Sequence, residues 1–92
     1  MHSVDDILKE RQSRYGDFTD NAEVSQSLKD LFRDCPAWET MPDFLREAFD
    51  GFALKASRAL TGDPSYPDNY IDIIGNFTLV LERLNDTTTR NP

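Results

Sequence analysis

Two aspartates near the end of this 92-residue chain have the spacing that a hard metal ion needs. Asp68 and Asp72 are four residues apart, so both carboxylates lie on one face if the segment is helical. Two carboxylates one turn apart can share a cation such as Mg²⁺, which prefers oxygen ligands. Gly75 shares their side, and a glycine inside a helix costs about 1 kcal/mol relative to alanine, so we expect a backbone or a ligand to approach it. In the structural alternative, Asp68 caps the helix and Asp72 is solvated.

Two basic residues on the preceding predicted helix have a spacing suited to a phosphate group. Lys55 and Arg58 are three residues apart and are therefore neighbours on a helix surface. A guanidinium group can hold phosphate oxygens bidentately, and a lysine binds them as a point charge. The alternative is that both bases form ion pairs within the protein, for example with Glu47.

A third group lies near the beginning of the chain, where arginines flank an aromatic residue and a glycine. The segment reads Arg11-Gln12-Ser13-Arg14-Tyr15-Gly16-Asp17-Phe18. Two guanidinium groups, an aromatic ring and a tight turn can together hold a phosphate and stack a base. The alternative is a helix-ending turn in which the ring of Tyr15 packs on the rest of the protein.

The remaining composition argues against several other functions. His2 is the only histidine and Cys35 the only cysteine, so we expect no zinc site, no intramolecular disulfide and no nucleophile paired with a histidine. The net charge of −7 disfavours binding to the phosphate backbone of nucleic acids and to anionic membranes. No stretch approaches the roughly 20 apolar residues of a membrane span, so we expect a cytoplasmic protein.

The elements that must position these groups are helices. Hydrophobic periodicity predicts four of them, over about residues 3–13, 21–34, 42–61 and 68–84. Ser3 is a suitable N-cap for the first helix, and Gly16 can adopt the positive φ that ends it. Asp20 with Glu23 resembles a capping box for the second helix. We expect an all-α protein, folded as a four-helix bundle.

The predicted fourth helix is apolar on more than one side. Most of its apolar residues point one way, namely Tyr70, Ile73, Ile74, Phe77, Val80, Leu81 and Leu84. Ile71 and Leu79 point elsewhere, and a chain this short buries only about two-thirds of its unfolded surface. We therefore expect a homo-oligomer, a dimer or larger. Residues 1–85 are predicted to form one domain, and residues 86–92 a disordered tail.

The three groups together resemble the motifs of a known family. Their order is Arg11-Gln12-x-x-Tyr15-Gly16-Asp17-x-x-x-Asn21, then Lys55-x-x-Arg58, then Asp68-x-x-x-Asp72-x-x-Gly75. This order resembles a small phage and prophage family that is catalogued as domain of unknown function 6378. That family is itself distantly similar to the all-α nucleoside triphosphate pyrophosphatases, which have the MazG-like fold. The resemblance covers about residues 7–81.

The resemblance implies an oligomeric, four-helix scaffold that binds a nucleotide, in the host cell cytoplasm if a phage encodes it. In the MazG-like enzymes, carboxylates on two helices hold Mg²⁺, which holds the triphosphate, and water attacks to release pyrophosphate. Here the corresponding candidates for Mg²⁺ are Asp68, Asp72 and Glu47. The enzymes carry a Glu-Glu-x-x-Glu type cluster where this chain offers only Glu47 and Asp50, and their last helix has a Glu-x-x-Asp spacing that is one residue shorter. These departures leave open whether the chain hydrolyses a nucleotide or only binds it.

The leading prediction is a phage-type nucleotide-binding protein, with or without Mg²⁺-dependent pyrophosphohydrolysis at a degenerate metal site. The residues predicted to contact phosphate and base are Arg11, Tyr15, Lys55 and Arg58. We expect Lys55 or Arg58 to lie within a few ångströms of Asp68 or Asp72, across two packed helices. The alternative is a non-catalytic acidic interaction protein that binds and blocks a host protein, and a third possibility is that these charges form a salt-bridge network that only stabilises the fold. Convergence of the charges in one pocket favours the first, and carboxylates spread over a convex face favour the second.

Overall fold

Residues 3–90, which the computed structural model describes, are helical almost throughout and contain no strand. They form four α-helices and one short 3₁₀ helix: α1 (Val4–Tyr15), α2 (Phe18–Asp34), η1 (Pro36–Thr40), α3 (Asp43–Thr61) and α4 (Pro67–Arg90). The prediction of an all-α chain with four helices is confirmed. The short helix η1, which joins α2 to α3, is not anticipated in the sequence analysis.

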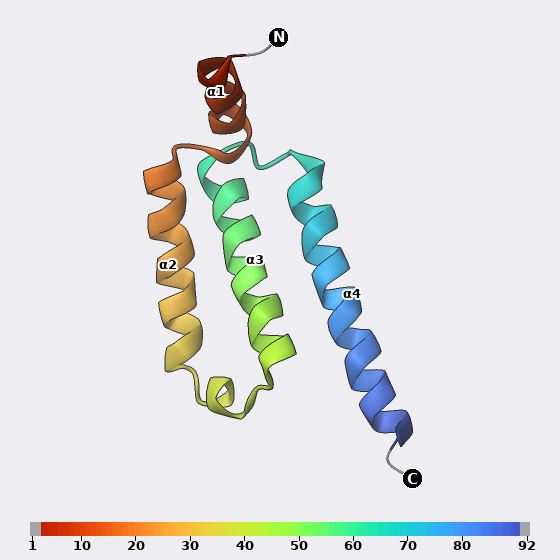
Figure 1. Cartoon of the computed structure of the whole chain (residues 1–92). Helices are drawn as coiled ribbons and strands as arrows, with labels where there is room; N and C mark the ends of the chain where they lie inside the picture. Colours follow the sequence, from red (N-terminus) through yellow and green to blue (C-terminus); the bar gives the residue numbers. More distant parts are fainter. Residues whose placement is uncertain (1–2, 91–92) are drawn as a thin grey trace.

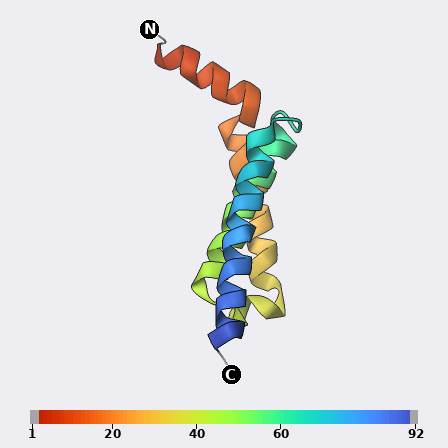
Figure 2. The same cartoon turned by 90° about the vertical axis from the view of Figure 1, so that its right-hand side faces the viewer.

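The helices form a flat layer rather than a compact four-helix bundle. Figure 1 shows α2, α3 and α4 side by side, with α3 in the middle, and α3 packs against both neighbours. Seen from the edge in Figure 2, α1 projects beyond one end of this layer, where it contacts α3 and, to a smaller extent, α2. None of the residues of α1 is buried. Its apolar stripe is too narrow to hold it against the layer along its length.

The first turn of the chain follows the predicted local rules. The Ser3 hydroxyl accepts a hydrogen bond from the backbone N–H of Asp6 at 3.1 Å, which confirms Ser3 as the N-cap of α1. Gly16 has a φ of 83° and ends α1, as predicted. A side chain at Gly16 would also place its Cβ 2.3 Å from the carbonyl oxygen of Thr61. The turn therefore needs glycine both for its conformation and for its contact with the end of α3.

The starts of α2 and α4 differ from the predicted ones. α2 begins at Phe18, three residues earlier than expected, because the carboxylate of Asp17 accepts hydrogen bonds from the backbone N–H groups of Thr19 and Asp20. α4 begins at Pro67, so Asp68 lies inside its first turn and is not the cap residue. Proline at the first helical position needs no hydrogen-bond partner for its nitrogen, which favours this earlier start.

The end of α4 also differs from the predicted one, because the helix continues past residue 85 as far as Arg90. No glycine or proline interrupts the chain between these positions, so the backbone hydrogen bonding of the helix can continue. The remaining part of the predicted tail, residues 91–92, lies outside the described residues.

Aromatic side chains connect the three helices of the layer. The ring of Phe32 on α2 lies 5.5 Å from that of Phe49 and 6.4 Å from that of Phe52, both on α3, measured between centroids. Phe77 on α4 contacts the same two rings, at 5.6 and 6.1 Å. Such pairs contribute about 0.5–1.5 kcal/mol each beyond the burial of their area. The fully buried Ala53 on α3 occupies little space, which suits the middle helix of a layer.

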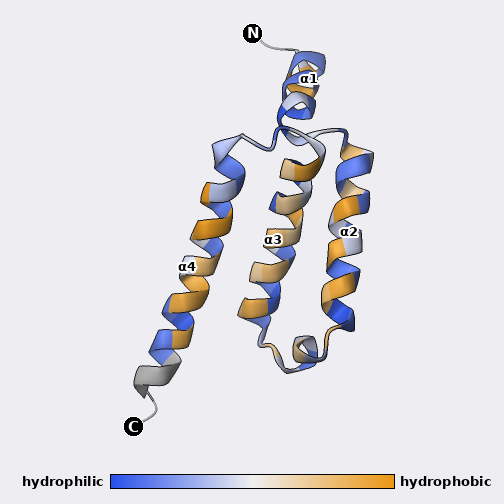
Figure 3. Cartoon of the chain, turned by 180° about the vertical axis from the view of Figure 1, so that it is seen from behind, coloured by the Kyte–Doolittle hydropathy of each residue, from blue (hydrophilic) through white to orange (hydrophobic). Residues whose placement is uncertain are grey.

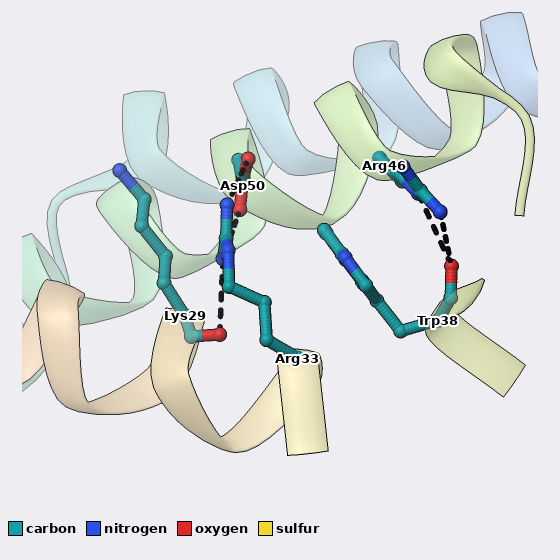
Figure 4. A network of polar contacts seen from close by, with 5 residues as sticks. All are labelled: Lys29, Arg33, Trp38, Arg46 and Asp50. Carbon is teal, nitrogen blue, oxygen red and sulfur yellow. Dashed lines mark hydrogen bonds and ion pairs between the residues drawn. The ribbon is translucent and has the colours of Figure 1, made fainter. Parts of the chain in front are cut away.

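Arginines and a tryptophan close the end of the layer at which α2 turns into α3. The buried ring of Trp38 lies under two guanidinium groups, with the Cζ atoms of Arg33 and Arg46 at 4.8 and 5.6 Å from its centroid. Figure 4 shows that Arg46 donates to the carbonyl oxygen of Trp38 and that Arg33 bridges to Asp50 and to the carbonyl oxygen of Lys29. These contacts fix η1 between the two helices.

The predicted apolar face of α4 is only partly covered. Ile73, Phe77 and Val80 turn towards α3 and are buried or half-buried. The other members of that predicted face are exposed, namely Tyr70, Ile74, Leu81 and Leu84. In a single layer the outer helix has one neighbour, so an apolar surface wider than one contact remains partly uncovered.

Candidate functional site

A cavity of about 330 Å³ lies where the end of α1 and the start of α2 meet the later turns of α3. Its walls come from residues distant in sequence: Leu8, Arg11, Gln12, Tyr15, Gly16, Asp17, Phe18, Asn21, Leu54 and Arg58. The cavity therefore contains the predicted nucleotide contacts Arg11, Tyr15 and Arg58. The fourth, Lys55, does not line it.

Two guanidinium groups converge on the ring of Tyr15. The Cζ atom of Arg58 lies 4.5 Å from the ring centroid, and that of Arg11 lies 5.4 Å from it. The edge of the same ring meets Tyr66, which precedes α4, with the centroids 5.9 Å apart. Cation–π contacts of this kind are worth about 0.5–1 kcal/mol at exposed sites, which is enough to orient the arginines but not to neutralise them.

Neither of these arginines is paired with a carboxylate among residues 3–86, whose side chains the structure describes. Other bases do have carboxylate partners: Arg14 pairs with Glu10, Arg33 with Asp50 and Lys55 with Asp72. Asp17 is the only acidic residue that lines the cavity, and one of its carboxylate oxygens is already bonded to backbone N–H groups of α2. The cavity thus carries an excess of positive charge in a chain whose net charge is −7.

The backbone around Tyr15 is held from both sides. The side-chain amide of Asn21 donates to the carbonyl oxygen of Tyr15 at 3.3 Å, and the Thr61 hydroxyl donates to the same oxygen at 3.0 Å. The amide oxygen of Asn21 accepts from the hydroxyl of the fully buried Ser57. These bonds connect α1, α2 and α3, so the ring of Tyr15 has a fixed place in the cavity wall.

The predicted contact between the bases of α3 and the aspartates of α4 is confirmed for one pair. The Nζ atom of Lys55 lies 2.8 Å from a carboxylate oxygen of Asp72, and the Lys55 side chain is only 20% exposed. Arg58, one turn further along α3, contacts Tyr15 instead. The two bases that the sequence groups together therefore serve different neighbours. Asp72 is not a lone solvated residue, because it is the counter-ion of a largely buried lysine.

Asp68 belongs to a second cluster of polar contacts, next to the loop before α4. The hydroxyl of Tyr66 donates to a carboxylate oxygen of Asp68 at 2.8 Å and accepts from Arg14 at 3.4 Å. The hydrogen bond to Asp68 raises the pKa of the Tyr66 hydroxyl above its ordinary value. In the same loop, the hydroxyl and the backbone N–H of Ser65 donate to Asp63 and lower the pKa of that carboxyl.

The three carboxylates predicted to hold Mg²⁺ do not come together. α3 and α4 run in opposite directions, so Glu47, near the start of α3, lies beside the later turns of α4. There it lines a second cavity of about 320 Å³, whereas Asp68 and Asp72 lie in the first turns of α4. Among the described residues, no three side chains of the metal-binding types form a group. The donor set does not fit a resident Mg²⁺ ion, because Asp72 is held by Lys55 and Asp68 by Tyr66.

Sequence reasoning missed three contributors to this region. Leu8 and Leu54 form part of the apolar wall of the cavity. Leu8 lies one turn before Arg11, and this spacing indicates that the two residues share a face of α1. Tyr66 precedes α4, and no local signal in the sequence places its ring against Tyr15.

Comparison with known proteins finds no relative of this chain. No family model matches the chain, and no curated protein and no solved structure matches it significantly. Within residues 3–90, none of the helices combines the length and the apolar character that crossing a lipid bilayer requires. The candidate site is therefore interpreted from its geometry.

Proposed function

We propose that this protein binds a nucleotide in the cavity between α1, α2 and α3. The observation that supports the proposal most is the convergence of Arg11 and Arg58, neither paired with a described carboxylate, on the ring of Tyr15. In a chain with seventeen acidic and ten basic residues, ion-pair partners are abundant, so a cavity that keeps two arginines away from them is suited to an external anion. The volume of about 330 Å³ falls in the range of small-molecule sites.

Each wall residue has a role that its chemistry suits. Arg58 and Arg11 would donate to phosphate oxygens, and their planar groups favour bidentate contacts. The ring of Tyr15 would offer a stacking surface for the base, held in place by Asn21 and Thr61. Lys55 is left out of the binding site in this proposal, because its charge is already neutralised by Asp72.

The proposal is one of binding and contains no hydrolytic step. The resemblance to the phage family and to the MazG-like pyrophosphatases agrees with a nucleotide ligand, and a homo-oligomer in the cytoplasm stays part of the prediction. The proposal includes no resident Mg²⁺ ion, since the candidate carboxylates do not form a shared site among the described residues.

A second candidate is the acidic interaction protein that binds and blocks a host protein. The observation in its favour is the projection of α1 beyond the layer with none of its residues buried, next to Phe18, which is 84% exposed. Large exposed apolar side chains near one another are typical of protein-binding surfaces. This candidate needs no small ligand, so the experiment below separates it from the first.

The test is a panel of nucleoside mono-, di- and triphosphates, with inorganic phosphate alongside, in thermal-shift assays with and without Mg²⁺. The best ligand is then titrated by calorimetry into wild type, Arg58→Gln, Arg11→Gln and Arg14→Gln. Arg14 is the matched control, because it lies on α1 close to Arg11 but pairs with Glu10 and does not line the cavity.

Loss of a charge-assisted hydrogen bond costs about 1.5–3 kcal/mol, so Arg58→Gln and Arg11→Gln are expected to weaken binding roughly 10- to 100-fold. Arg14→Gln should leave the affinity within about twofold, because its contacts lie outside the cavity. A panel without any stabilising nucleotide, or equal effects of all three substitutions, would overturn the proposal. Release of pyrophosphate from a bound triphosphate in the same samples would reveal the hydrolysis that the proposal omits.

A further inference from the structure

α4 carries an apolar stripe on its outer side that the described residues cover only in part. The stripe consists of Tyr70, Ile74, Phe77, Leu81 and Leu84. Of these, Phe77 also packs on the rings of α3, whereas Ile74 and Leu81 are 66% and 60% exposed. Figure 3 shows apolar residues along the length of α4, which packs on α3 within the layer.

The spacing within this stripe is that of a helix-pairing surface. Successive members are four, three, four and three residues apart, which is the repeat by which two helices pack side chains into one another over their length. The repeat extends over two heptads. Ile73 and Val80 already face α3. The apolar surface of α4 is therefore wider than its contact with α3 requires.

The charge of the stripe also suits a copy of the same chain. Each copy carries a net charge of −7, so two copies repel one another. This repulsion is weakest where the two facing surfaces carry no carboxylates. The stripe and the residues that flank it contain no charged side chain: positions 70, 71, 73, 74, 77, 78, 80, 81, 84 and 85 are all uncharged. The neighbouring carboxylates lie at Asp72 and Glu82, on other sides of the helix.

The chain exposes more surface than a compact monomer of its mass. The accessible area is 6807 Å², whereas a compact monomer of 10.5 kDa exposes about 5,400 Å². The radius of gyration of 16.1 Å is likewise larger than the about 12 Å expected for this length. This excess belongs to the whole chain: it includes α1, none of whose residues is buried, as well as exposed apolar residues of α4 such as Ile74 and Leu81.

We propose that the apolar stripe of α4 binds the same stripe of a second copy, so that two layers associate through their α4 helices. A symmetric pair needs one self-complementary surface, and the stripe provides it. The contact completes the core that a single layer leaves half covered, because Phe77 belongs both to the aromatic cluster and to the stripe. The proposal does not depend on nucleotide binding, since the cavity is lined by α1, α2 and α3 alone.

The experiment measures mass in solution by light scattering at a few tens of micromolar, for wild type, Leu81→Glu and Leu79→Glu. Leu79 is the matched control, because it lies on the same helix with 59% exposure but points about 160° away from Leu81. Wild type is expected at twice the chain mass. Leu81→Glu is expected to weaken dimerisation by at least about a hundredfold, because it places a carboxylate in the apolar contact between the copies, and Leu79→Glu should remain dimeric.

A second measurement covers the case in which Leu81→Glu does not fold. Leu81→Cys and Leu79→Cys, each combined with Cys35→Ser, are labelled with a maleimide at high and low protein concentration. The thiol at position 81 should react more slowly than that at position 79 when the protein is concentrated, and the difference should disappear on dilution. A monomeric wild type, or protection of position 79 instead of 81, would overturn the proposal.

Discussion

The ion pair between Lys55 and Asp72 separates a structural role from a binding role for the two residues. Replacing Asp72 by asparagine keeps the size of the side chain and removes its charge. Lys55 then remains 80% covered without a counter-ion, since its Nζ atom lies 2.8 Å from the lost carboxylate oxygen. The expected result is a loss of stability without a loss of nucleotide affinity, because neither residue lines the cavity.

The magnitude follows from the exposure of the two partners. Exposed pairs contribute about 0.2–1 kcal/mol, and removing one partner of a fully buried pair costs about 3–5 kcal/mol. Lys55 is mostly covered, but Asp72 is 48% exposed and partly screened by water. We therefore expect Asp72→Asn to lower the free energy of unfolding by about 1–2 kcal/mol, which lowers Tm by roughly 5–15 °C for a domain of this size.

The assay is thermal and urea unfolding at one fixed protein concentration, in the wild-type background and in Lys55→Met. Methionine keeps an apolar stem of similar length and removes the charge that needs Asp72, so Asp72→Asn should cost less than about 0.5 kcal/mol in that background. Asp30→Asn, at an exposed position on α2, is the control and should change stability by less than about 0.5 kcal/mol. The wild-type effect should shrink in high salt, because Asp72 is half exposed.

Two outcomes would refute this reasoning. Equal costs of Asp72→Asn in both backgrounds would show that the two charges are not coupled. A variant that melts like wild type but binds the nucleotide at least about tenfold more weakly would return Asp72 to the binding site, as the sequence motif implied.

Two further predictions concern Gly75 and Tyr66. At Gly75, no neighbouring group lies within 4 Å of the position that a Cβ atom would take. Gly75→Ala should therefore stabilise the protein by about 1 kcal/mol and raise Tm by roughly 4–8 °C in thermal unfolding. A lower Tm would show that a partner or ligand approaches this position. The hydrogen bond to Asp68 raises the pKa of Tyr66 above its ordinary value of 10.0, so the neutral hydroxyl favours the folded state, and this contribution to stability is present below about pH 10 and is lost as the pH rises through the raised pKa. In an ultraviolet absorbance titration of the tyrosines, Asp68→Asn should therefore move one transition to lower pH, and identical curves for the two proteins would contradict the assignment.

Local sequence rules account for most of the helix ends. Ser3 as a cap and Gly16 at a positive φ were both predicted, because each depends on atoms within a few residues along the chain. The early start of α2 at Phe18 shows the limit of these rules. Asp17 and Asp20 are both suitable caps by type, and only the observed backbone bonds of Asp17 decide between them.

Three residues singled out in the sequence, Arg11, Tyr15 and Arg58, line the cavity, but the sequence did not indicate how the predicted residues are grouped. Lys55 and Arg58 share one side of a predicted helix, and the same spacing is compatible with one joint site. In the structure they lie one turn apart along α3, so that one reaches Asp72 on α4 and the other reaches Tyr15 on α1. That division depends on where the end of α1 and the first turns of α4 lie relative to α3, and no local sequence pattern contains this information.

Spacing along the chain determined which side chains share a helix face, since the period of the helix is a local property. Which face becomes covered depends on contacts between residues far apart in sequence. Glu47 was grouped with Asp68 because the resemblance to the MazG-like enzymes implied it, yet the antiparallel course of α3 and α4 separates the two. In the same way, the apolar residues of α4 were evident in the sequence, but only the flat arrangement of α2, α3 and α4 decided that Ile74 and Leu81 remain uncovered, because an outer helix of a single layer has a neighbour on one side only.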